Sequence, residues 1–134
     1  MKPEIEIVVD AGRYDPVGMR RAFESLPSGM SRKLAVLGDM PALGADELEQ
    51  HAALSSSLVT NGFVRVFTVG ECMRALRGAL PRPMRAAHAD TPDLIETSLT
   101  EELRSGDVVL IKGADRAFGS LAARLETRGA VHAL

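Results

Sequence analysis

The chain contains very little cysteine and no tryptophan. Of its 134 residues one is a cysteine, Cys72, and aromatic residues make up 4%. A single cysteine excludes an internal disulfide and is typical of a reducing compartment, so we expect a cytoplasmic protein. Because no second cysteine and no histidine lies near Cys72 in the sequence, we interpret it as a small, partly buried hydrophobe at the start of a helix.

Long apolar segments and charge of a single sign are also missing. No hydrophobic run is long enough to cross a membrane, and the first residues contain no signal-peptide core. The net charge is −2, and basic and acidic residues are interspersed, so the sequence predicts no surface for nucleic acid. With 46% hydrophobic and 25% charged residues, the composition is that of a globular protein, and residues 1–134 fit one domain.

Several motifs that carry chemistry are absent. The sequence has no Walker A motif and no G-x-G-x-x-G after its first strand-like run, so it has no evident means of cradling a triphosphate. It has no cysteine and histidine spacing typical of zinc sites. The serines at 55–57 lie within a predicted helix and not at a nucleophile elbow. We therefore predict no catalytic residue and no metal site.

Strand-like and helix-like segments alternate along the whole chain. Apolar runs predict strands over 4–10, 33–37, 63–69, 84–89, 108–112 and 131–134. Apolar residues at helical spacing predict helices over 16–26, 45–61, 71–80, 92–104 and 118–128. This alternation predicts an α/β fold: a three-layer, Rossmann-like domain with a mostly parallel sheet of five or six strands and helices on both faces.

Some finer details can also be predicted. In the helix over 45–61, Leu48 and Val59 belong to the apolar face. Thr91 is placed to cap the following helix, in which Leu94 points inward. Met30 is expected to fill the core together with the other methionines.

Charged residues and glycines stand where the predicted strands end. Asp10 follows the first strand, Asp39 follows the second, and Lys112 and Gly113 end the fifth. Ligands of parallel α/β folds bind at this edge of the sheet. We therefore expect a site here, walled by the loops Ala11–Asp15 and Gly38–Gly44.

Each candidate residue has a purely structural alternative. Lys112 either places its ammonium against a phosphate or carboxylate, or pairs with Asp39 or Asp10. Asp10 either accepts hydrogen bonds from a ribose or caps the turn that follows it. For Asp39 we favour a role in holding the loop Gly38–Gly44, and for His51 a hydrogen-bonded, half-buried position on its helix.

The amino-acid sequences of these segments resemble those of the C-terminal domain of the Mur ligases. The matching segments follow one another in order and cover nearly the whole chain. They read Val8-Val-Asp10 with Pro16-Val-Gly-Met19, Ala35-Val-Leu-Gly-Asp-Met40 with Leu43-Gly44 and His51, Val66-Phe-Thr-Val-Gly-Glu71, and Gly106-Asp-Val-Val-Leu-Ile-Lys-Gly113. Within the family, the sequence most resembles the branch that adds D-alanyl-D-alanine to UDP-muramoyl tripeptide in peptidoglycan (cell wall) biosynthesis.

The resemblance implies the mobile lid of an ATP-dependent amide ligase whose ATP and Mg are bound mainly by a separate P-loop domain. It places Asp10 near the ATP ribose, and Lys112 and Gly113 beside the incoming amino acid or dipeptide. Asp39, His51 and Arg116 complete the predicted substrate-binding residues. We expect no activity from the chain alone. The expected partners are ATP-binding and UDP-substrate domains, in cis or in trans, and neither nucleic acid nor a membrane.

Three loops differ from the family's pattern. Gly12-Arg-Tyr-Asp15 stands in place of Tyr-Asn-Ala-Asn, Ala42 replaces Glu, and Ala114-Asp-Arg116 stands in place of Ser-Arg-Gly. These departures leave two hypotheses: a divergent ligase domain with another amine substrate, or a non-catalytic binding or regulatory module on the same fold. A phospho-acceptor receiver domain is disfavoured, because the strand ending in Thr68-Val-Gly-Glu71 provides no acceptor aspartate.

Overall fold

Six parallel strands form one sheet in the computed structural model, which describes residues 4–27 and 29–134. The strands are β1 (Ile5–Val9), β2 (Lys33–Gly38), β3 (Phe63–Val69), β4 (Arg85–Ala89), β5 (Val108–Lys112) and β6 (Gly129–Ala133). Their order in the sheet is β4-β3-β2-β5-β1-β6, and every neighbouring pair is parallel. The predicted parallel α/β sheet is confirmed, with six strands.

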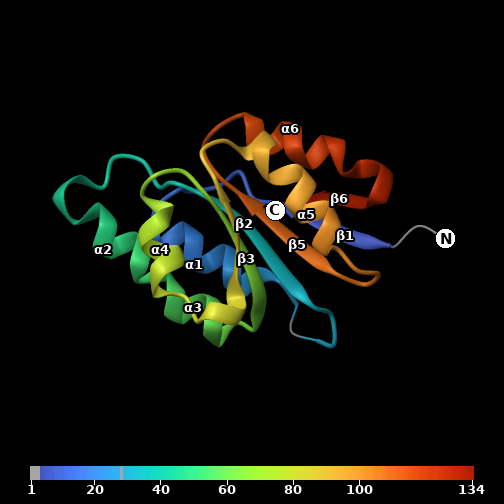
Figure 1. Cartoon of the computed structure of the whole chain (residues 1–134), viewed down its shortest axis with the longest axis horizontal. Helices are drawn as coiled ribbons and strands as arrows, with labels where there is room; N and C mark the ends of the chain where they lie inside the picture. Colours follow the sequence, from blue (N-terminus) through green and yellow to red (C-terminus); the bar gives the residue numbers. More distant parts are fainter. Residues whose placement is uncertain (1–3, 28) are drawn as a thin grey trace.

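Helices cover both faces of this sheet (Figure 1). On one side lie α1 (Pro16–Ser25), α2 (Glu47–Ala52), α3 (Leu54–Thr60) and α4 (Met73–Ala79). On the other lie α5 (Glu96–Glu102) and α6 (Ala117–Arg124). Short 3₁₀ turns occupy Gly44–Asp46, Arg82–Met84, Pro92–Ile95 and Glu126–Arg128. In the part of the chain that the structure describes, no helix has the length and apolar character needed to span a membrane.

Alternate residues of the central strands belong to two separate cores. In β5, Leu110 packs in the core beneath α1, α3 and α4, whereas Val109 and Ile111 pack in the core beneath α5 and α6. Successive side chains of a strand point to opposite faces, so a strand covered on both sides must be apolar throughout. This explains why β2 and β5 were readable as unbroken apolar runs.

The prediction of one continuous helix over 45–61 is wrong. The segment begins with a 3₁₀ turn and then divides into α2 and α3. Leu48 and Val59 are 55% and 49% exposed, so they do not form the apolar face. The buried stripe is made instead by residues three and four positions apart, which are His51, Leu54 and Leu58.

Two expectations around other turns are also wrong. Thr91 makes no capping hydrogen bond through its side chain, and the segment after it begins as a 3₁₀ turn. In that tighter turn Leu94 is 64% exposed. Met30 is fully exposed in the connection between α1 and β2, where there is no core to fill. The other methionines named as core residues are buried: Met19, Met40, Met73 and Met84.

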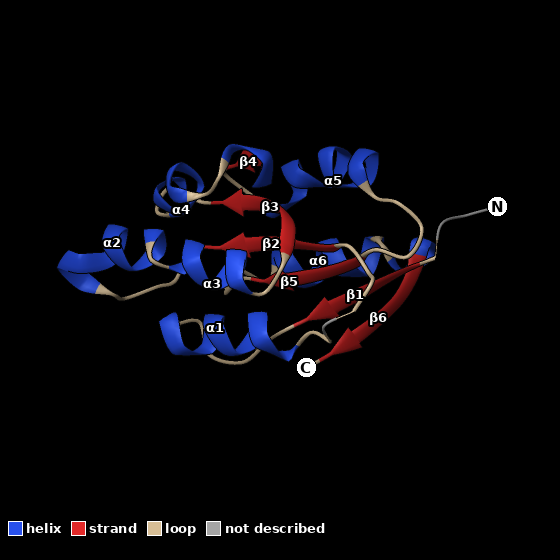
Figure 2. Cartoon of the chain, turned by 90° about the horizontal axis from the view of Figure 1, so that it is seen from below, coloured by secondary structure: helices blue, strands red, loops and turns tan. Residues whose placement is uncertain are grey.

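The path of the chain determines at which edge of the sheet a ligand is expected. Figure 2 shows the strand arrows pointing the same way, so their carboxyl ends share an edge. β5 lies between β1 and β2. The chain leaves β5 for α6 on one face, but leaves β1 and β2 for helices on the other face. Connections that part in this way create the usual ligand position of an open α/β sheet.

Candidate functional site

An ion pair joins the ends of β1 and β5. The Nζ atom of Lys112 lies 2.8 Å from Oδ1 of Asp10, and the exposed fractions of the two side chains are 0% and 14%. The same Oδ1 accepts a hydrogen bond of 2.7 Å from the backbone N–H of Gly12. β1 and β5 are adjacent, with Val9 opposite Ile111, so their next residues meet. Both structural alternatives from the sequence are therefore present: Lys112 pairs with Asp10, and Asp10 caps its own turn.

Tyr14 closes the other side of the buried ammonium. The Nζ atom of Lys112 lies 4.6 Å from the centroid of the Tyr14 ring, a favourable cation–π distance. Lys112 thus has a carboxylate on one side and an aromatic face on another, and it does not reach solvent. A phosphate or carboxylate can contact this ammonium only after Tyr14 or Asp10 moves.

A hollow of about 290 Å³ lies over the ends of β1 and β5, and Asp10 contributes to its wall. Within residues 4–27 and 29–134, the Oδ2 atom of Asp10 takes part in no hydrogen bond or ion pair. Tyr14, Phe118 and the exposed Arg116 also line the hollow. Its lining therefore includes a carboxylate with an unused oxygen, two aromatic rings, a guanidinium and a second carboxylate, that of the exposed Asp115. Small-molecule pockets span about 300–1,000 Å³, so the hollow suits a sugar or a small amino acid better than a whole nucleotide.

Two strand-end glycines make room for Phe118. A Cβ atom at Gly113 would lie 2.1 Å from the Phe118 ring, and one at Gly38 would lie 2.4 Å from it. Both distances are far below van der Waals contact, so only glycine lets the ring cover the ends of β2 and β5. The contact of Gly113 with an amino-acid substrate remains a prediction, since packing alone accounts for the glycine.

Asp39 stabilises the start of α4. Its Oδ1 accepts a hydrogen bond from the backbone N–H of Met73 at 2.9 Å, and its Oδ2 accepts one from Cys72 at 3.2 Å. A carboxylate in this position satisfies free N–H groups of the helix and interacts favourably with the helix dipole. Gly70 leaves the space, since a Cβ atom there would lie 2.6 Å from the carboxylate. The expectation that Asp39 holds the loop Gly38–Gly44 is wrong, because its bonds go to α4.

His51 holds that loop instead. Its Nε2 accepts a hydrogen bond from the backbone N–H of Met40 at 2.9 Å, which places the proton on Nδ1. Nδ1 donates to the backbone carbonyl of Glu47 at 2.6 Å. The side chain is 0% exposed, so His51 is hydrogen-bonded as interpreted, but fully and not half buried. A contact between His51 and substrate remains a prediction.

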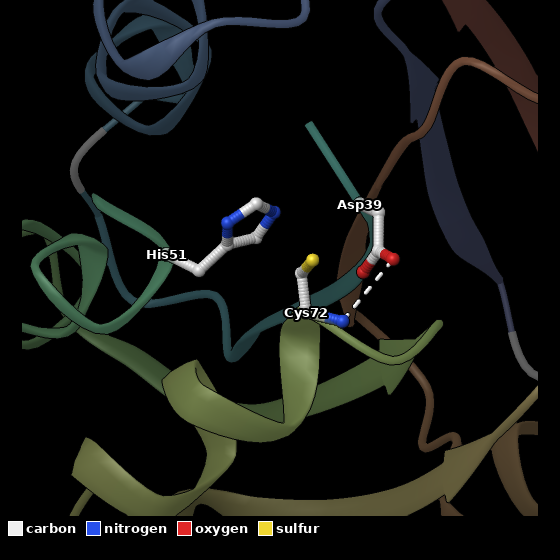
Figure 3. A group of neighbouring side chains, drawn as sticks. All are labelled: Asp39, His51 and Cys72. Carbon is white, nitrogen blue, oxygen red and sulfur yellow. Dashed lines mark hydrogen bonds between the residues drawn. The ribbon is translucent and has the colours of Figure 1, made fainter. Parts of the chain in front are cut away.

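The sequence analysis missed one group of side chains. Asp39, His51 and Cys72 offer one ligand atom each, and these atoms all lie within 4.8 Å of one another (Figure 3). No spacing motif reveals the group, because it forms only when the parallel sheet brings the loops after β2 and β3 together. Burial and, secondarily, the Asp39 carboxylate raise the pKa of the Cys72 thiol, so the protonated thiol is favoured and the cysteine is no activated nucleophile.

His88 occupies the end of β4. Its Nδ1 lies 2.7 Å from Oγ1 of Thr68, while its buried Nε2 has no partner among the described residues. Burial lowers the pKa of His88, and the guanidinium groups of Arg74 and Arg77 lower it further. The neutral imidazole is therefore the favoured form at pH 7.

Two other hollows suit a nucleotide less well. One of about 250 Å³ lies beside the first at the same edge, and its three carboxylates would repel a phosphate. These belong to Asp39, Asp90 and Asp115. A hollow of about 550 Å³ lies at the amino ends of the strands, away from the usual ligand edge, and is lined by Glu4, Glu6 and Asp107. There Asp107 pairs with Arg32 at 2.8 Å.

The sequence of this chain also matches a known protein family. The sequence model of the family described as Mur ligase, glutamate ligase domain, matches residues 2–115. The chain belongs to the Mur ligase C-terminal domain family. The matched range of this Mur ligase domain contains Asp10, Lys112 and the Asp39 group, and it ends before α6.

Solved structures share the fold of this Mur ligase domain. The MurF ligase from Thermotoga maritima in complex with ADP has 24% identity and a TM-score of 0.71, over 96% of this chain and 29% of that chain. MurF from Acinetobacter baumannii has 21% identity and a TM-score of 0.66, and the match covers 86% of this chain and 26% of that chain. A domain assigned to a UDP-N-acetylmuramate:L-alanyl-γ-D-glutamyl-meso-diaminopimelate ligase from Haemophilus ducreyi has 22% identity and a TM-score of 0.64. The match covers 90% of this chain and 89% of that chain. The chain spans less than a third of each MurF ligase.

Proposed function

We propose that this domain is the lid of a divergent, ADP-forming acid–amino-acid ligase and contributes to the nucleotide and amine sites when it closes. The hollow over β1 and β5 carries the proposal. It has an unused Asp10 oxygen and the Arg116 guanidinium, but its 290 Å³ make only part of a nucleotide site. A partial site needs a second surface, which agrees with a chain that spans under a third of the MurF ligases.

The residues present fit one part of the ATP and Mg that the family implies. The Oδ2 atom of Asp10 can accept a hydrogen bond from a ribose hydroxyl, while Lys112 and Gly12 hold Oδ1. The sequence has no glycine-rich phosphate loop, so triphosphate and Mg fit a separate ATP-binding domain. When bound there, ATP supplies the phosphoryl group that activates a substrate carboxylate.

In this proposal the domain positions groups and excludes water. The buried ammonium of Lys112 fixes the Asp10 carboxylate, so the direction of its free oxygen is set before a ligand arrives. Arg116 provides a cation at the rim for the carboxylate of an incoming amino acid or dipeptide. Closure of the lid keeps water from the activated substrate.

A non-catalytic binding or regulatory module is the second candidate. The sealing of Lys112 favours it. Asp10 and Tyr14 flank the ammonium, so Lys112 cannot pair with the carboxylate of an amino-acid substrate at the end of β5. Such a module recognises a protein or a small molecule without forming ADP.

Amine-dependent ADP formation by the complete ligase separates these candidates. Asp10→Asn keeps an oxygen for Lys112 and Gly12 and changes the free oxygen into an amide nitrogen. It also removes the counter-charge of the buried Lys112 ammonium, so urea denaturation first establishes that the variant is folded under the assay conditions. We expect kcat/KM for ATP to fall by about 10–100-fold, the value of a hydrogen bond to a charged group. The matched control is Asp93→Asn, an exposed change away from the hollow, with unchanged kinetics.

The outcomes have different meanings. Equal ADP formation by wild type and Asp10→Asn contradicts the nucleotide role of Asp10. If the complete protein forms no ADP with any amine tested, the ligase proposal fails and the binding module stands.

A further inference from the structure

Three side chains of different metal-binding types lie close together at the edge of the sheet that also carries the hollow over β1 and β5. Asp39 follows β2, His51 belongs to α2 and Cys72 precedes α4. Their ligand atoms lie within 4.8 Å of one another. Figure 3 shows the His51 ring and the Cys72 sulfur directed toward the space that the Asp39 carboxylate borders. A thiolate, an imidazole and a carboxylate are the donors that zinc prefers, and three such ligands leave a fourth position for water.

The surroundings already hold two of the three ligands in place. His51 donates from Nδ1 to the carbonyl of Glu47, which fixes the ring and leaves the lone pair on Nε2. Metal-binding histidines are oriented by this kind of outer hydrogen bond. Each oxygen of Asp39 accepts one backbone N–H and keeps further acceptor capacity. An ion can approach from the neighbouring hollow, which Asp39 lines, and Cys72 is partly exposed.

Binding an ion requires local adjustment. The N–H of Met40 now donates to the His51 lone pair at 2.9 Å, and the ion takes its place. Zinc bonds of about 2.0–2.3 Å set neighbouring ligand atoms about 3.3–3.8 Å apart, so a separation at the 4.8 Å limit closes by about 1.0–1.5 Å. Cys72 releases its thiol proton to solvent as the metal–sulfur bond forms. One lost hydrogen bond is small beside the binding free energy of zinc sites.

We propose that Asp39, His51 and Cys72 bind one thiophilic divalent cation, with zinc as the best match, and water as a fourth ligand. The ion ties the end of β2, α2 and the start of α4 together and so stabilises the fold beside the hollow. Mg²⁺ prefers oxygen ligands, so this site is distinct from any Mg²⁺ that accompanies ATP. The proposal does not depend on the ligase function.

Cobalt(II) titration of the reduced 134-residue chain tests the site. One equivalent of Co²⁺ is expected to give the visible bands of four-coordinate cobalt and a near-ultraviolet thiolate-to-cobalt band, and Zn²⁺ is expected to remove both. Cys72→Ala removes the sulfur and keeps a small apolar side chain. It should abolish the thiolate band and weaken Co²⁺ binding by at least about 100-fold. Asp93→Asn, an exposed carboxylate outside both the group and the neighbouring hollow, is the matched control with unchanged binding.

A second measurement needs no variant. In the wild-type chain, zinc should protect Cys72 from alkylation and, at about 100 times the Kd, raise the midpoint of thermal unfolding by several degrees. A six-coordinate cobalt spectrum, a thiolate band that survives in Cys72→Ala, or alkylation at the same rate with and without zinc overturns the proposal.

Discussion

Asp10 and Asp39 occupy similar places, each directly after a buried parallel strand, but the fold uses them differently. Asp10 has both of its contacts on one oxygen and leaves the other without a partner among the described residues. Asp39 has a backbone N–H on each oxygen and lies beside an imidazole and a thiol. The first arrangement suits a ligand that donates a hydrogen bond, and the second suits a cation. The contacts already made by a strand-end carboxylate, and not its position alone, decide which ligand it can take.

Removal of the buried ammonium should have the largest effect on the Asp10 side. Lys112→Met keeps most of the side-chain volume but leaves the Asp10 carboxylate without its counter-charge. Breaking such a largely buried pair is expected to lower the free energy of unfolding by about 3 kcal/mol, as measured by urea denaturation. The double variant Asp10→Asn/Lys112→Met should recover at least half of that loss. Strictly additive losses would show that the two groups are not coupled.

Packing at the ends of β2 and β5 gives the next largest effect. Gly113→Ala places a methyl group against the Phe118 ring and is expected to cost about 1–3 kcal/mol in thermal or urea unfolding. Adding Phe118→Leu should relieve part of this loss. The control is Gly78→Ala in α4, where a Cβ atom meets nothing within 4 Å. It should stabilise the chain by about 0.5–1 kcal/mol. Equal effects of the two alanines would contradict the packing role.

Loss of the α4 cap probes the Asp39 side. Asp39→Ala removes acceptors from Cys72 and Met73 and is expected to cost about 1–2 kcal/mol. Native-state hydrogen exchange should show faster exchange of these two amides and an unchanged rate at Gly12, whose acceptor is Asp10. Faster exchange at Gly12 would mean that the contacts of Asp10 and Asp39 are coupled, which would contradict their independent roles.

The smallest expected effect is a pH dependence at the end of β4. The pKa of His88 is lowered in the fold from its ordinary 6.5, so the unfolded chain binds a proton more readily. This contribution to stability is complete above pH 6.5 and is lost as pH falls toward the lower folded pKa. The unfolding free energy of wild type minus that of His88→Asn should therefore decrease from pH 7.5 to pH 5. A difference that does not vary with pH would contradict the assignment.

The fold was predictable because its strongest signals are local. β2 and β5 lie in the middle of the sheet with both faces buried, so each reads as an unbroken apolar run. The Lys112–Asp10 pair was predictable as an alternative, because parallel strands end together. Leu48 and Leu94 were misplaced because a 3₁₀ turn near each of them shifts the buried face relative to a regular helix.

The parts of the site that escaped prediction depend on contacts distant in sequence. Asp39 accepts hydrogen bonds from the N–H groups of Cys72 and Met73 at the start of α4, 33 and 34 positions later. Cys72 and His51 meet only after the loops following β2 and β3 are placed side by side. The Tyr14 ring over Lys112 likewise has no periodic or motif signal in the sequence. Such contacts follow from side-chain packing, which hydrophobic periodicity does not encode.

Mapping ADP onto the isotope-labelled chain by NMR tests the central claim most directly. A partial nucleotide site over β1 and β5 predicts saturable amide shifts confined to residues 10–14 and 113–119, and Asp10→Asn should weaken them. Saturable shifts centred on residues 39–44 and 70–73 would contradict the claim that the nucleotide binds over the ends of β1 and β5.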